Sequence, residues 1–171
     1  MPPIKHMTVV NTEVQKMRYA VRGGMLAFLL FVACSAVASS PAIGLAFSNG
    51  SLQVDNARVW GNTTIFDGNT IETSKAASDV KLNTGVQMRL ASDSRAKVYQ
   101  QYMVLEKGYG QVEASGGYEV QARSLRITPA APHTVARVRL EGESTVMVAA
   151  LTGLVRVTNS AGVVVAKQPA A

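Results

Sequence analysis

Apolar and polar residues alternate with a period of two along much of the chain after residue 79. In one such segment, Val138 and Leu140 alternate with Arg137 and Arg139. Successive side chains of a β-strand point to opposite faces of the sheet, so each segment predicts a strand with one buried and one solvent-exposed face. One-sided strands are typical of antiparallel sheets, because parallel strands are buried on both faces. The segments are 80–82, 86–90, 112–114, 120–122, 125–127, 138–140, 146–150 and 155–157.

Turn sequences separate these segments at intervals of about 8–12 residues, a spacing that favours a sandwich or a barrel. Gly, Asn and Asp dominate the turns because they tolerate the backbone angles that tight turns need. Pro129 and Pro132 predict a longer loop, since proline is excluded from central strands. We therefore predict an all-β fold, an antiparallel β-sandwich or jelly roll. Candidate turns are Asp67-Gly68, 83–85, 106–108, 115–117, Glu141-Gly142, Gly153 and 159–162.

A single core suffices for a domain of about 120 residues. We expect its large side chains to be the aromatic residues of this region, with Val and Leu filling the remaining space. These residues are Trp60, Phe66, Tyr99, Tyr102, Tyr109 and Tyr118.

An uncharged run of 23 residues, 25–47, precedes the alternating region. As a helix it would extend about 34 Å, enough to cross a hydrocarbon core of roughly 30 Å. Residues 1–24 carry four Lys or Arg against Glu13, and basic residues beside a first span stay in the cytoplasm. The sequence thus predicts a short basic cytoplasmic tail (1–24), a membrane helix or signal sequence (25–47) and an exported domain (48–171).

The uncharged run has three interpretations. An uncleaved anchor has the required length, although a Ser39-Ser40-Pro41 sequence interrupts its second half. A cleaved signal peptide would use the small residues Ala36 and Ala38 as its processing site. A lipoprotein signal would make Cys34, the only cysteine of the chain, a lipidation site. We prefer the anchor in the inner membrane of a bacterium, with the C-terminal domain in the periplasm.

The sequence carries no pattern that indicates catalysis. A single Cys and the distant His6 and His133 exclude a disulfide framework and a cysteine-based zinc site. The chain also lacks a Gly-x-Ser-x-Gly motif, a phosphate-binding glycine loop and a calcium loop. We therefore predict a non-enzymatic protein with no cofactor and no small-molecule substrate.

A run of motifs in the exported region resembles the FecR domain. They are 66–73 (FDGNTIET), Ser78-x-Val80-x-Leu82, Gly85-x-x-Met88-x-Leu90, and the Leu105-x-x-Gly108 turn that opens a strand. The similarity covers about residues 50–160. It implies a periplasmic β-domain tethered to the inner membrane. The family's namesakes bind a sigma factor through a much longer cytoplasmic segment, which 24 residues are too short to supply.

Basic residues on expected outward strand positions are the best candidates for recognition. Neighbouring strands would gather them into one positive face for a protein, an anionic lipid or an acidic envelope polymer. A net charge of only +3 in an exported domain argues against nucleic acid. The two functions we consider are a tethered interaction domain and a signalling regulator that acts on a separate cytoplasmic partner. The candidate residues are Lys81, Arg89, Arg95, Lys97, Arg137 and Arg139.

The fate of the uncharged run can be measured by intact mass spectrometry of the protein from its native membrane. An uncleaved anchor gives the mass of the full chain. Cleavage after Ala38 removes 38 residues, and lipidation at Cys34 leaves a shorter chain that carries added acyl mass. A mature chain starting at residue 39 would contradict the preferred interpretation.

Overall fold

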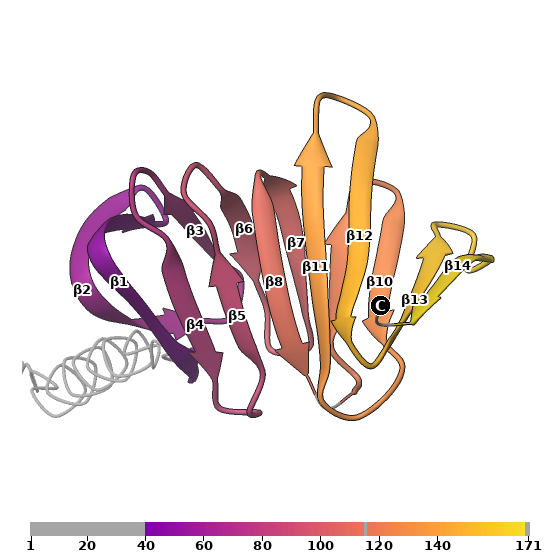
Figure 1. Cartoon of the computed structure of the whole chain (residues 1–171). Helices are drawn as coiled ribbons and strands as arrows, with labels where there is room; N and C mark the ends of the chain where they lie inside the picture. The colour runs from indigo at the N-terminus through magenta and orange to yellow at the C-terminus, as the bar shows by residue number, and fades with distance from the viewer. Residues whose placement is uncertain (1–39, 115, 170–171) are drawn as a thin grey trace, which may run out of the picture. The chain divides into compact units, whose positions relative to one another are not determined.

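A computed structural model describes residues 40–114 and 116–169, which form an all-β unit without a helix (Figure 1). Its strands are β1 (Ala42–Val54), β2 (Ala57–Phe66), β3 (Asn69–Thr73), β4 (Ser78–Leu82), β5 (Gln87–Leu90), β6 (Arg95–Val98), β7 (Tyr102–Lys107), β8 (Tyr109–Ala114), β9 (Glu119–Ala122), β10 (Leu125–Pro129), β11 (Thr134–Glu141), β12 (Thr145–Thr152), β13 (Leu154–Asn159) and β14 (Val164–Pro169).

All these strands belong to one sheet that folds back on itself in two layers (Figure 1). The front layer contains β4, β5, β8, β11 and β12, and the back layer contains β3, β6, β7, β9, β10, β13 and β14. Strand β1 joins them, because Gly44–Ser48 pairs with β4 whereas Leu52–Val54 pairs with β3. Strand β2 follows β1 on its other edge. At the opposite end β12 approaches β13 and β14, so the sheet is nearly closed, like a barrel.

The predicted all-β class is confirmed. Pairing is antiparallel everywhere in the described sheet except between β7 and β9, which are parallel. The finer prediction of a sandwich or jelly roll is not confirmed, because hydrogen bonds connect every described strand into one sheet. The predicted glycine turns do separate strands: Gly68 follows β2, Gly85 lies between β4 and β5, and Gly153 lies between β12 and β13.

The predictions for the N-terminal region fall largely outside the described residues. The basic tail, the Ala38 processing site and Cys34 all belong to that part. Residues 42–47, which we assigned to the uncharged run, form the first half of β1 instead. Within the residues that the structure describes, no helix is long and apolar enough to cross a membrane.

The core consists mainly of aliphatic side chains, which corrects the expectation of an aromatic core. Of the six aromatic residues expected there, only Tyr118 is buried, with 2% of its surface exposed. Trp60 is 70% exposed and Phe66 38%, because both occupy outward positions of β2. Inward positions of the two layers carry Ile, Leu, Val, Met and Ala instead. The largest fully buried side chains are Leu52, Ile65, Ile71, Leu82, Leu90, Met103, Leu105 and Ile127.

Buried hydrogen bonds of Thr73 and Ser94 stabilise the corner where the chain passes from β7 in the back layer to β8 in the front layer. Thr73 Oγ1 donates a hydrogen bond to the Ala91 carbonyl (2.5 Å) and accepts one from the Ser94 amide (2.9 Å). Ser94 Oγ accepts a hydrogen bond from the Tyr109 amide (3.0 Å). Gly108 makes the corner itself with a φ of +80°, and a Cβ there would lie 2.5 Å from Ser94 Oγ.

Substituting Gly108→Ala should therefore destabilise the fold strongly. The positive φ costs about 1–2 kcal/mol in any residue with a Cβ, and the contact with Ser94 adds roughly 1–3 kcal/mol. Gly85→Ala is the matched control, because Gly85 has a φ of +88° but open space around its Cβ position. Urea unfolding should show a clearly larger loss for Gly108→Ala. Equal losses would contradict the packed corner.

Candidate binding groove on the front layer

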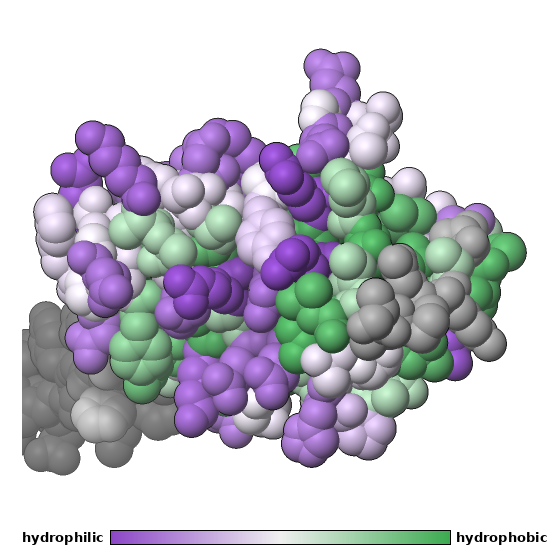
Figure 2. All heavy atoms as spheres, in the orientation of Figure 1, coloured by the Kyte–Doolittle hydropathy of each residue, from purple (hydrophilic) through white to green (hydrophobic). Residues whose placement is uncertain are grey.

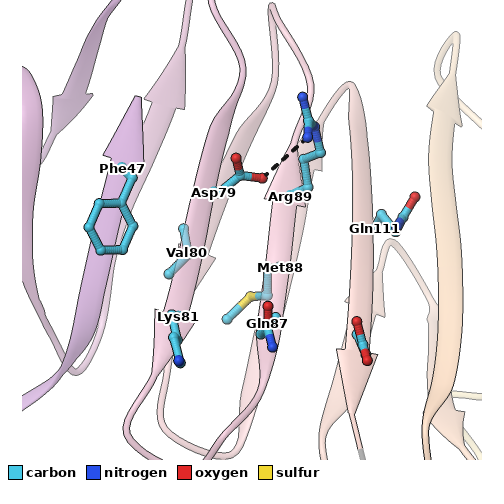
Figure 3. Close-up of a pocket in the computed structure, with 9 residues that line it drawn as sticks. Phe47, Asp79, Val80, Lys81, Gln87, Met88, Arg89 and Gln111 are labelled. Carbon is cyan, nitrogen blue, oxygen red and sulfur yellow. Dashed lines mark ion pairs between the residues drawn. The ribbon is translucent and has the colours of Figure 1, made fainter. Parts of the chain in front are cut away.

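A shallow groove of about 300 Å³ lies on the outer face of the front layer (Figure 3). Strands β1, β4, β5 and β8 form its floor and walls. Figure 2 shows a largely polar surface over the middle of this face, with apolar side chains toward both ends. The residues that line it are Phe47, Asp79, Val80, Lys81, Gln87, Met88, Arg89, Gln111 and Glu113.

Strand register places the polar side chains of the groove in two parallel rows. One row runs from Asp79 through Arg89 to Gln111, which are paired across β4, β5 and β8. The other row runs from Lys81 through Gln87 to Glu113 in the same way. Paired positions share a face of the sheet, and the inward residues between them are buried. The alternation that builds the core therefore also builds the groove.

Opposite charges balance within the groove. Lys81 and Arg89 contribute two positive charges, and Asp79 and Glu113 contribute two negative ones. Arg89 Nη1 lies 3.7 Å from Asp79 Oδ1, with both side chains 61% exposed, so this ion pair adds little to stability. Both groups stay available to a ligand. The groove thus offers donors and acceptors in regular order rather than a uniformly positive surface.

The structure separates the six predicted basic residues into two groups. Lys81 and Arg89 line the groove, and Arg137 and Arg139 project from β11 on the same face. The Arg137 guanidinium lies 5.6 Å from the centre of the Tyr109 ring, and Arg139 Nε lies 3.3 Å from Glu141.

The other two residues, Arg95 and Lys97, lie on β6 in the back layer. Arg95 forms ion pairs with Glu106 at 2.9 Å and Glu72 at 3.3 Å. The strand order therefore does not place all six basic residues on a single face.

Lys97 belongs to a separate aromatic cluster on the back layer. The rings of Tyr99 and Tyr102 stack with their centres 4.3 Å apart, and the Lys97 ammonium lies 5.6 Å from the Tyr99 ring centre. The Tyr99 hydroxyl raises the pKa of Lys97, and desolvation together with Tyr99 raises the pKa of Tyr102. Both shifts favour the protonated forms, so Lys97 is cationic and Tyr102 is neutral at neutral pH.

The sequence patterns did not predict several of the residues that line the groove. Phe47 is the last residue of the predicted uncharged run, and Asp79 lies just before the first alternating segment, 80–82. Gln87, Gln111 and Glu113 are polar members of the alternating segments, so their outward direction was available from the sequence. The sequence does not show that these three residues share one surface, because that depends on β8 pairing with β5 rather than with β7.

The most strongly perturbed titratable group among the described residues, Tyr118, is structural. Burial raises the pKa of Tyr118 far above its ordinary value, with nearby Asp67 adding to the effect. Its hydroxyl donates a hydrogen bond to the Tyr99 carbonyl at 3.2 Å. In residues 40–114 and 116–169, no group of three or more His, Cys, Asp or Glu could hold a metal ion.

The sequence matches no protein-family model, and no curated protein matches it. The resemblance to the FecR domain therefore stays a prediction that rests on the residues quoted for it.

The buried Tyr118 predicts a loss of stability in alkali. The unfolded chain releases the phenol proton above a pH of about 10, whereas the folded chain retains it, so the free energy of unfolding falls as the pH rises past that value. Tyr118→Phe loses one hydrogen bond, worth about 1 kcal/mol at neutral pH, but its stability should fall less steeply above pH ~10. Urea unfolding at neutral and alkaline pH tests this. Parallel losses in both proteins would contradict it.

Proposed function

We propose that this protein is a non-enzymatic, FecR-like binding domain that is tethered to the bacterial inner membrane and faces the periplasm. The front-layer groove contacts an extended polar chain, either a segment of another protein or an envelope polymer. The observation that carries the proposal is the double row of outward polar side chains over an open groove of about 300 Å³.

The shape and chemistry of the groove suit an extended ligand better than a compact one. Small-molecule pockets are concave and bury most of their ligand, whereas this groove is open and shallow. Residues two apart on one strand lie about 7 Å apart, and neighbouring strands lie about 5 Å apart. Such a lattice of amides and charges presents evenly spaced hydrogen-bond partners to a repeating chain.

The sequence supports the setting of this domain. The basic tail and the uncharged run favour export with a retained anchor. Tethering confines the groove to the membrane surface, which raises its effective concentration toward other membrane-bound partners.

A photo-crosslinking amino acid at Gln111 in the full-length chain tests the groove in cells. We expect an adduct of increased mass. Treatment with a muramidase would shorten a glycan adduct, and protease would remove a protein adduct. The matched control carries the same crosslinker at Gln121, which is also half-buried and lies on β9 in the back layer.

Removing the two positive charges of the groove should strongly reduce that adduct. The double variant Lys81→Ala and Arg89→Ala loses two charge-assisted hydrogen bonds worth roughly 1.5 kcal/mol or more each, so the adduct at position 111 should fall by at least about tenfold. Equal adducts at positions 111 and 121, or an adduct that the double variant leaves unchanged, would contradict the groove as the binding site.

A further inference from the structure

We infer that the outer face of the β1–β2 hairpin lies against the lipid headgroups of the membrane that holds the chain. The inference rests on the proposed anchor and adds a membrane contact made by the folded domain itself. Four large apolar side chains on this hairpin are exposed: Leu45 (43%), Phe47 (41%), Trp60 (70%) and Phe66 (38%).

The hairpin register places Leu45, Phe47 and Phe66 on the outer side of the first half of β1, and Trp60 on the outer side beyond the bend, where it pairs with Ser51. Leu45 pairs with Thr64 and Phe47 with Asn62, and paired residues of an antiparallel ladder point the same way. On β2, Trp60 and Phe66 occupy the same exposed alternate positions as these two partners. The other face carries the buried Ala46, Leu52 and Ile65. The four apolar side chains on the outward face of the hairpin therefore do not pack into the core of the domain.

Chain connectivity brings this face to the bilayer. Because β1 begins at Ala42, the uncharged residues left to span the membrane are the 17 residues 25–41. Phe66 pairs with Ala42 across the hairpin, so it lies beside the first residue after that segment. Leu45 follows three residues later, within about 11 Å along a fully extended chain. The β4–β5 turn lies beside the same residue, because Asn83 Nδ2 donates a hydrogen bond to the Ala42 carbonyl (2.8 Å).

The length of the spanning segment favours the same contact. Seventeen residues make a helix of about 25 Å, which is shorter than a hydrocarbon core of roughly 30 Å. A short span draws its flanking residues into the interface. Trp is favoured there because its ring is apolar and its N–H is a hydrogen-bond donor, and Phe and Leu side chains insert at the boundary between headgroups and acyl chains.

Charges around the hairpin suit an anionic surface. Arg58 lies two residues from Trp60 on the same exposed alternation, and Lys81 pairs with Leu45 across β1 and β4. Three carboxylates lie close to the hairpin: Asp55 and Asp67 in the chain and Asp79 opposite Phe47, and Asp67 accepts a hydrogen bond from the Gln100 amide. Asp55 accepts hydrogen bonds from Asn69 Nδ2 and the Thr70 amide, and Asp79 faces Arg89. Phe47 belongs to both the hairpin face and the groove, so the groove would open beside the bilayer surface.

Trp60 is the only tryptophan of the chain, which makes it a direct probe. The full-length protein is placed in nanodiscs of phosphatidylcholine and phosphatidylglycerol, with or without bromine on the acyl chains near the headgroups. Insertion at the depth of an interfacial apolar face should quench Trp60 emission by about half with brominated lipid and shift it to shorter wavelength. The control is the double variant Trp60→Phe and Met147→Trp, which moves the probe to an exposed position on β12.

The outcomes separate this inference from the proposed function. Quenching of Trp60 but not of the probe at position 147 supports the membrane contact, and Leu45→Ser with Phe47→Ser should reduce it. A chain that inserts in nanodiscs while Trp60 stays unquenched by brominated lipid overturns the inference and leaves the groove intact. If Trp60 is protected from aqueous acrylamide but is not quenched by brominated lipid, and the protein has the mass of a dimer, the hairpin contacts a second copy of the chain instead of the membrane. That result would overturn the inference. A chain that does not associate with nanodiscs overturns the tether as well.

Discussion

Strand β1 supplies backbone hydrogen bonds to both layers of the sheet. Its first half pairs with β4 and its second half with β3, both on the same edge, while β2 follows it along the other. The register shift between Phe47 and Ser51 provides the bend between the halves. Because the two layers share this strand, their inner faces meet at one end without a loop between them. The aliphatic residues of both layers can then form a single core.

The same pairing determines which surface is available for recognition. Every strand of the front layer buries one set of alternate residues, so the other set must face solvent in rows that cross the strands. The row of Asp79, Arg89 and Gln111 exists only because β8 lies in the front layer and pairs with β5, although the strand before it, β7, lies in the back layer. The Gly108 corner makes that exchange of layers possible. The groove is thus a consequence of topology as much as of local sequence.

The sequence predicts the strand class well and the surface only in part. Alternation identifies segments such as 138–140, and the glycine turns separate the strands at Gly68, Gly85 and Gly153. It does not predict the long β1, because apolar residues 42–47 continue an uncharged run without a break in composition. It also places Trp60 in the core, since hydrophobicity alone does not reveal which face of β2 is inward. Arg95 and Lys97 are separated from Arg89 by a change of layer that no local pattern encodes.

The chain alternates between layers as it advances. After β3 it lays β4 and β5 in front, β6 and β7 behind, β8 in front, β9 and β10 behind, β11 and β12 in front, and β13 and β14 behind. Position along the molecule therefore follows position along the chain (Figure 1). As a consequence, every described strand pairs only with strands at most three positions away in the chain. The described ladders at the β12–β14 end share no strand with the bent hairpin, so the two ends of the sheet depend on each other only through the strands between them.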